Sequence, residues 1–251
     1  MATILMPLPR RDFDPSETGI PWRVLGARGH RFVVATPDGA PGEADPRMVT
    51  GAGLGLLAPM LKADRHGLAA WQALQSSPEF RSPITHDAIA ATRFDALLLP
   101  GGHAKGMRDY LESPVLQQAV AAAFAAGKPV GAICHGVVLA ARSQAAPGRS
   151  VLHGRRTTSL LRSQELLAWN LTRLWLGDYY RTYPQTVEDE VTAALARKAD
   201  FERGPTSFSR DTPDKPDGFA VIDGNYVSAR WPGDAHRFSL AFDSVIGAGA
   251  G

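Results

Sequence analysis

Four short apolar runs, none of which alternates polar with apolar residues, constrain the fold of this chain most strongly. Such runs are typical of strands that are buried on both faces, as in a parallel sheet. Helix-like segments separate them, and strands that alternate with helices predict right-handed βαβ units. We therefore expect an α/β fold, a three-layer sandwich around a mostly parallel, flavodoxin-like central sheet. The runs are Thr3 to Pro7, Arg31 to Thr36, Phe94 to Leu99 and Val130 to Ile133.

The clearest helical pattern lies between the last two runs. The segment Pro114 to Ala126 has apolar residues at helical spacing, with Ser113 before it as a cap and Gly127 after it as a stop. A shorter helix is expected at Pro21 to Gly29, between the first two runs.

Two segments do not fit the regular alternation. Residues from about 40 to 92 are expected to form a helical insertion beside the sheet. Arg162 to Lys198 is expected to be helical, within a decorated C-terminal part of about 160–215. The last strands are expected as a hairpin over 219–230 that turns at Asp223-Gly224. Because no repeat and no linker is visible, we expect one domain over residues 1–251.

Charge and cysteine content argue against several classes of protein. The net charge is +2, and the only adjacent basic pairs are Arg10-Arg11 and Arg155-Arg156, which is not a nucleic-acid-binding pattern. A single cysteine excludes an internal disulfide and a cysteine-cluster metal site. No stretch approaches the ~20 apolar residues of a membrane span, and the N-terminal apolar run is too short for a signal peptide. The sequence therefore predicts a cytoplasmic, metal-free protein that binds neither nucleic acid nor membrane.

The strongest local motif is Ala132-Ile133-Cys134-His135-Gly136, at the end of an apolar run and the start of a helical pattern. A strand–turn–helix junction exposes a nucleophile above the sheet edge, and the helix N-terminus favours a thiolate. With an imidazole adjacent, we expect Cys134 to titrate below the usual thiol pKa of about 8.5. The structural alternative is an inert core cysteine.

Two further features follow neighbouring strands. Gly101-Gly102-His103 comes after the Phe94 to Leu99 run, and adjacent glycines let backbone N–H groups approach a ligand as an oxyanion hole. A plain tight turn is the commoner meaning of this motif. Glu17 follows the first strand and opens the first helix, where a glutamate is usually a solvated partner of the helix dipole. Carboxyl ends of parallel strands converge on one crevice, which would bring Cys134, Gly102 and Glu17 together.

Glu17-x-x-x-Pro21, Pro100-Gly-Gly-His103 and Ala132-Ile-Cys-His-Gly136, in this order, resemble the DJ-1/PfpI superfamily, a branch of the class I glutamine amidotransferase-like fold. The insertion and the Pro-Gly-Gly-His turn are most similar to the Hsp31-like group of glyoxalase III and chaperone proteins. The resemblance covers nearly the whole chain. No synthetase domain accompanies the motifs, so a glutamine amidotransferase is not expected.

The resemblance implies a role for each motif residue. Cys134 would be the nucleophile, Glu17 would hydrogen-bond its sulfur, and His135 would be the acid/base partner. Gly102 and His135 would supply oxyanion N–H groups beside Gly101, and His103 would contact substrate or only shape the turn. Glu165 stands where the Hsp31-like group often carries the acidic residue that orients the histidine. Its rivals are Asp178, Glu188 and Asp234.

The sequence departs from the group at Ala104, where a glycine is usual, and in the Arg230-Trp-Pro-Gly-Asp234 segment. The segment that contains Trp169, Trp175, Tyr179 and Tyr180 is unusually aromatic, and such residues more often form a core or a dimer interface than a substrate box. These departures concern the choice of substrate.

Together, motifs and resemblance predict a cofactor-independent cysteine enzyme that acts on small reactive carbonyls, such as a glyoxalase III-like conversion of methylglyoxal to lactate. One alternative is a small amide or peptide hydrolase of the PfpI type. Another is a stress-response holdase chaperone in which Cys134 senses oxidation. A homodimer is expected, with a small-molecule carbonyl or amide as the substrate of an enzyme.

Overall fold

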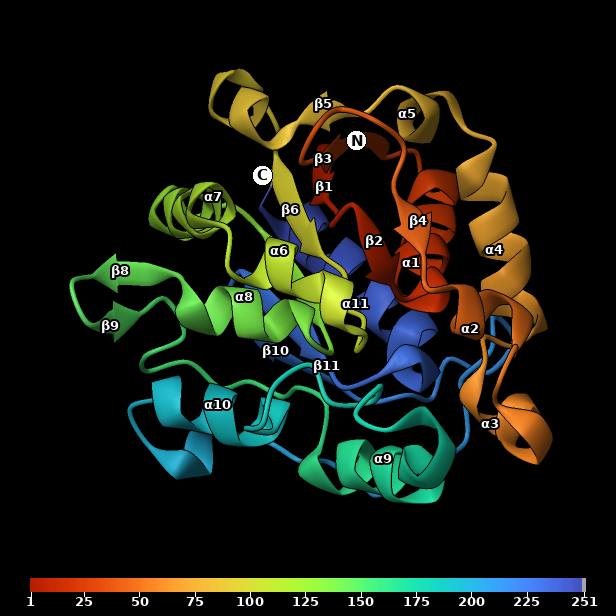
Figure 1. Cartoon of the computed structure of the whole chain (residues 1–251). Coiled ribbons are helices and arrows are strands. Elements are labelled where there is room, and N and C mark those ends of the chain that lie inside the picture. The colour runs from red at the N-terminus through yellow and green to blue at the C-terminus, as the bar shows by residue number, and fades with distance from the viewer. Residues whose placement is uncertain (250–251) are drawn as a thin grey trace.

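The computed structural model describes residues 1–249 and contains a seven-stranded central sheet (Figure 1). The sheet strands are β1 (Thr3–Pro7), β3 (Arg31–Thr36), β5 (Ile84–Thr85), β6 (Ala96–Leu99), β7 (Val130–Ile133), β10 (Ala220–Asp223) and β11 (Tyr226–Ala229). Their order is β10-β11-β7-β6-β1-β3-β5, and every neighbouring pair is parallel except β10 and β11. The expected mostly parallel α/β sheet is confirmed, as is the C-terminal hairpin.

Helices cover both faces of this sheet. They are α1 (Pro15–Ala27), α2 (Pro46–Thr50), α3 (Ala58–Leu61), α4 (Arg65–Gln75), α5 (Pro78–Arg81), α6 (Arg108–Leu111), α7 (Pro114–Ala125), α8 (Gly136–Arg142), α9 (Arg162–Leu176), α10 (Val187–Ala194) and α11 (Ala235–Ala248). On one face α11 packs on β7 and β11 and against α1, while on the other α7 and α8 pack on β6 and β7. The expected three-layer sandwich is confirmed.

Short elements complete the chain outside the central sheet. Two small ribbons pair β2 with β4 and β8 with β9. Their bounds are β2 (Arg11–Phe13), β4 (Glu43–Ala44), β8 (Gln144–Ala146) and β9 (Arg149–Ser150), and 3₁₀ turns occupy Gly55–Leu57, His86–Ala91, Lys105–Met107, Lys198–Asp200 and Pro232–Asp234. Within residues 1–249, no helix combines the length and the apolar character that crossing a bilayer requires.

The first helix begins six residues earlier than the sequence pattern suggested. Asp14 caps it, since its Oδ1 accepts hydrogen bonds from the backbone N–H groups of Ser16 (2.7 Å) and Glu17 (3.0 Å). Pro15 occupies the first turn, where a missing N–H costs nothing, and Pro21 lies inside the helix rather than at its start. This earlier start places Glu17 in the first helical turn, directly above the sheet edge.

The segment of about 40–92 is mostly helical, as expected, and its longest helix, α4, packs against α1. The approach is close, because a Cβ on Gly19 would lie 2.7 Å from the backbone nitrogen of Trp71. Two short strands in this segment were not foreseen: β4 pairs with β2, and β5 pairs with β3 and extends the central sheet at its edge.

The expected helical segment from Arg162 to Lys198 is interrupted. It forms α9 and α10, which lie together at the lower edge of Figure 1, with a loop over residues 177–186 between them. Gly177 at φ +56° ends α9, because it adopts a backbone conformation that other residues avoid. This loop brings further side chains to the carboxyl edge of the sheet.

Candidate active site

Cys134 lies at a strained junction between β7 and α8. Its φ is +57°, a left-handed conformation that costs a residue other than glycine about 1–2 kcal/mol. The helix that follows can start so close to the sheet only because residue 136 is glycine: a Cβ there would collide with the carbonyl oxygen of Leu99. The predicted nucleophile-elbow geometry is therefore present.

The Gly-Gly-His turn lies beside this junction because β6 and β7 are neighbours. Gly102 and His103 line the same pocket as Cys134. Gly101 lies behind them, where a Cβ would be 2.6 Å from Glu17 Oε2 and 2.8 Å from the backbone nitrogen of His135. The turn thus needs a glycine at 101 for close packing of three segments rather than for contact with the pocket.

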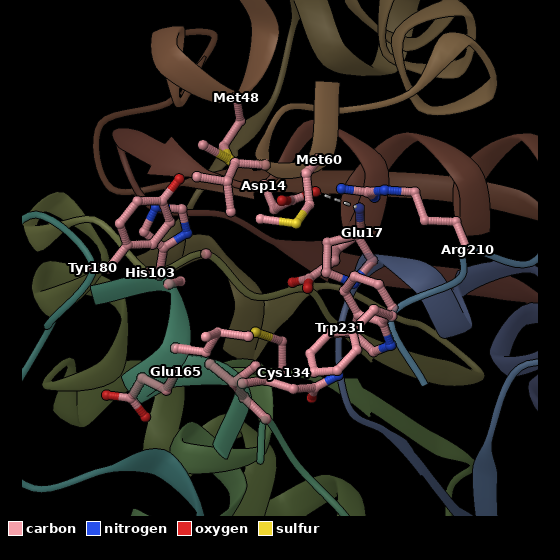
Figure 2. A pocket seen from close by; sticks show the side chains of 18 of the residues that line it. Asp14, Glu17, Met48, Met60, His103, Cys134, Glu165, Tyr180, Arg210 and Trp231 are labelled. Atoms are coloured by element: carbon pink, nitrogen blue, oxygen red, sulfur yellow. Dashed lines mark hydrogen bonds between the residues drawn. The ribbon is translucent and has the colours of Figure 1, made fainter. Parts of the chain in front are cut away.

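Glu17 is fully buried and points toward the sulfur of Cys134 (Figure 2). Burial, and then the negative charge of Asp14, raise the pKa of Glu17 well above its usual range, while the nearby Cys134 thiol and Gly101 N–H oppose the increase. Among residues 1–249 neither carboxyl oxygen has a hydrogen bond of standard geometry. The raised pKa favours the neutral form of the Glu17 carboxyl group, which is able to donate a hydrogen bond to a thiolate.

The expected low pKa of Cys134 is wrong. Burial raises the pKa of the thiol well above its usual value, any ionisation of Glu17 and the charge of Asp14 act in the same direction, and the backbone N–H of His135 opposes them. The adjacent imidazole carries no positive charge, because burial, together with His103 and Arg142, lowers the pKa of His135 to about 3. The thiol is thus protonated at pH 7 and needs a base.

His135 is placed to be that base. Its Nδ1 is 3.4 Å from Cys134 Sγ, and its Nε2 is 3.0 Å from Thr182 Oγ1. The Thr182 hydroxyl is also 2.5 Å from the carbonyl oxygen of His103, which can only accept, so its single hydrogen is donated there. Thr182 Oγ1 must then accept from Nε2–H, which leaves a lone pair on Nδ1 facing the thiol.

Glu165 does not occupy the position that the resemblance implied. Its Oε2 accepts a hydrogen bond from Val187 N (2.9 Å), its Oε1 is 3.4 Å from Arg181 Nε, and its carboxyl group points away from Cys134 (Figure 2). Burial raises the pKa of Glu165 to about 7. The buried partner of His135 Nε2 is Thr182 instead.

The three rival acidic residues are also engaged elsewhere. Asp178 accepts from Trp169 Nε1, Glu188 pairs with Arg203, and Asp234 pairs with Arg230. Sequence reasoning missed Thr182 because it assigned residues 177–186 to a helix. Gly177 and Pro184 were the signals of a loop there.

The pocket above Cys134 is a cavity of about 120 Å³. Tyr180 lines it and stacks on His103 with ring centroids 4.4 Å apart. Tyr179 lies outside the lining, and its hydroxyl donates a hydrogen bond to Asp45. Of the four aromatic residues noted in the sequence, only Tyr180 belongs to the lining. Arg210 and Trp231 complete the opposite side (Figure 2).

Comparison with known proteins finds relatives by sequence and by structure. Deglycases of Pyrococcus abyssi and Pyrococcus furiosus are each 28% identical to this chain over 163 residues, which is 65% of this chain and 69% of either relative. The Rapid Encystment Protein 24 kDa of Francisella tularensis superposes with a TM-score of 0.69 at 16% identity, covering 98% of this chain and 99% of that one. Glyoxalase III of Candida albicans superposes with a TM-score of 0.61 at 15% identity, covering 97% and 96%.

These structural matches show the shared fold. The family model described as ThiJ/PfpI family-like matches residues 8–193, most of the chain, and confirms the resemblance inferred from the three motifs. The chain therefore belongs to the ThiJ/PfpI-like family of the DJ-1/PfpI superfamily, which has enzymes among its members.

Proposed function

We propose that this protein is a cofactor-independent enzyme that adds Cys134 to the aldehyde group of a 2-oxoaldehyde and converts methylglyoxal and water to lactate. The observation that carries the proposal is the arrangement around one sulfur atom, with His135 Nδ1 at 3.4 Å from Sγ on one side and the buried Glu17 carboxyl group, whose pKa is raised, on the other. Relatives that are named deglycase and glyoxalase III support the same class of chemistry.

In the first step His135 Nδ1 takes the thiol proton as the sulfur bonds to the aldehyde carbon. The carbonyl π electrons move to oxygen, and the backbone N–H groups of Gly102 and His135 would stabilise the resulting oxyanion. Glu17 donates a hydrogen bond to the sulfur atom while the sulfur carries negative charge. The oxyanion then takes the proton from His135, which gives a neutral hemithioacetal.

In the second step His135 removes the proton from the hemithioacetal carbon, and the electrons move toward the adjacent ketone to give an enediol. Return of a proton to the former ketone carbon produces a lactoyl thioester. Water then attacks the thioester carbonyl, the C–S bond breaks, and lactate leaves as Cys134 regains its proton. One aldehyde carbon is oxidised and the neighbouring ketone carbon is reduced, so no external redox partner is needed.

The test is to incubate the purified protein with methylglyoxal and to quantify lactate, with Cys134→Ala in parallel. Lactate from the wild type alone supports the proposal. Release of product from small amides by the wild type, without lactate, would replace it with the hydrolase alternative. Equal protection of a denatured client by both proteins, without turnover, would replace it with the chaperone alternative.

A further inference from the structure

Much of the pocket is lined by apolar side chains from several separate parts of the chain. They come from α2 and α3, from α9 and the residue Leu160 shortly before it, and from the segments around residues 208 and 231. The members are Met48, Met60, Leu61, Leu160, Leu167, Ala168, Leu171, Phe208 and Trp231. We call this set the apolar wall. The same pocket is also lined by three residues that the proposed mechanism uses, Cys134, Glu17 and Gly102.

Several members of the apolar wall remain open to solvent. Met60, Leu167, Leu171 and Phe208 are between 39% and 54% exposed. Large apolar side chains that gather around a cavity mark a binding site more often than a chance surface. Here they border the same cavity as the only thiol of the chain, which identifies the occupant as the molecule that reacts with Cys134.

Two charged groups of the lining are engaged within the protein. Arg210 Nη2 donates to the carbonyl oxygen of Lys62 and its guanidinium lies over the Trp231 ring, while Glu165 is engaged with Val187 and Arg181. Gln164 donates to Ser207 O. Its Oε1, together with Tyr180 Oη, His103 Nε2 and Trp231 Nε1, has no hydrogen-bond partner among the described residues, so these few atoms beside the reacting groups make up the free polar capacity of the lining, while the other side chains of the apolar wall offer none. Hydroxyl groups placed against the apolar wall would lose their hydrogen bonds to water without replacement.

We infer that the preferred substrate carries an aliphatic chain beyond its reactive carbonyl group and that the apolar wall binds this chain. The cavity volume of about 120 Å³ is several times the ~10–15 Å³ that one water molecule needs, so it holds more than the methyl group of methylglyoxal. The inference rests on the proposed function for the chemistry, but the binding of the chain is separable from turnover.

The turnover test compares three 2-oxoaldehydes: methylglyoxal, 2-oxohexanal, and 3-deoxyglucosone, which is 2-oxohexanal with hydroxyl groups on its last three carbon atoms. Each buried methylene favours binding about 2- to 4-fold. We expect kcat/KM for 2-oxohexanal to exceed that for methylglyoxal, and that for 3-deoxyglucosone, by at least ~10-fold. Equal values for 2-oxohexanal and methylglyoxal, or a preference for 3-deoxyglucosone, would overturn the inference while leaving the proposed function intact.

The binding test needs no turnover. Cys134 is the only thiol, so its alkylation by iodoacetamide reports on access to the pocket, and straight-chain alcohols from 1-butanol to 1-octanol serve as probes. We expect protection whose midpoint concentration falls about 2- to 4-fold for each added methylene. Absence of protection would overturn the inference even if methylglyoxal is turned over, and protection without any turnover would sustain it while the proposed function fails.

A matched pair of variants on α9 localises the effect. Leu171→Asn changes the apolar wall, whereas Leu174→Asn makes the same change one helical turn further on, at a side chain that is 92% exposed and outside the lining. We expect the midpoint concentration for protection to depend less on the length of the alcohol in Leu171→Asn, and to depend on it as in the wild type in Leu174→Asn. If sedimentation instead shows a dimer that both variants dissociate, with no alcohol protection in any of them, a second copy covers the wall and the inference is wrong.

Discussion

Replacing Thr182 with valine tests how His135 becomes a base. The Thr182 side chain is fully buried and its hydroxyl joins His103 O to His135 Nε2. Valine has nearly the same shape but no hydroxyl, so Nε2–H loses its acceptor. The tautomer with its proton on Nε2 then loses the hydrogen bond that stabilised it. The other tautomer, with its proton on Nδ1, becomes populated, and it cannot accept the proton of the Cys134 thiol.

The magnitude follows from the burial of both groups. Leaving a buried donor or acceptor without a partner costs about 1–3 kcal/mol. If that cost falls on the reactive tautomer, deprotonation of Cys134 slows about 5- to 150-fold, since ~1.4 kcal/mol is a factor of ten. The His103 carbonyl also loses its partner, so we expect the free energy of unfolding to fall by a similar ~1–3 kcal/mol.

The assay is the rate of iodoacetamide alkylation of the single thiol at pH 7, which needs no knowledge of the substrate. Thr182→Ser is the matched control, because it keeps the hydroxyl while removing a methyl group, and we expect its alkylation rate to stay near that of the wild type. A wild-type rate in Thr182→Val, with stability lowered as expected, would refute the assignment of Thr182 as the residue that sets the His135 tautomer.

Three further predictions concern buried groups near the site. Burial raises the pKa of Glu165 to about 7, so the contribution of this residue to stability is present below pH ~4.5 and is lost as the pH rises through about 7. Between pH 4 and pH 8 the free energy of unfolding of the wild type, measured in urea, should therefore fall by up to ~3 kcal/mol relative to that of Glu165→Gln. Glu17→Ala should slow alkylation of Cys134 more than Glu17→Gln does, because a neutral carboxyl donates to the thiolate; faster alkylation in the alanine variant would show that Glu17 is ionised. Gly101→Ala should destabilise the fold by ~1–3 kcal/mol through overpacking, while Gly26→Ala, where a Cβ meets nothing within 4 Å, should be neutral or stabilising in the same thermal melts.

The sheet could be predicted from sequence because its strands are buried on both faces. β1, β3 and β7 begin and end at the residues that the apolar runs indicated, and β6 starts two residues later than expected. β5 was missed because a two-residue strand at a sheet edge leaves no periodic pattern. The start of α1 was misplaced because Pro21 was interpreted as a helix start, although Asp14-Pro15 is the stronger capping signal.

The candidate site was predictable where it depends on local backbone geometry and not where it depends on side-chain direction. Cys134, Gly102 and Glu17 follow strand ends, and the topology of a parallel sheet brings them together. The partner of His135 depends instead on the path of a loop, and spacing along the chain cannot say whether Glu165 turns toward the imidazole or away from it. The pKa of Cys134 was misjudged for a related reason, because burial is a property of the whole fold.

The segment from α9 through the 177–186 loop contributes both to the apolar wall, through Leu167 and Leu171, and to the hydrogen bond on His135, through Thr182. Transplanting this segment between homologous proteins would therefore carry substrate preference and base orientation together. Insertions or deletions within it would displace Thr182 and lower the reactivity of Cys134, while the central sheet would stay folded. A library aimed at new specificity should keep the length of this segment constant and randomise only the pocket-facing positions of α9.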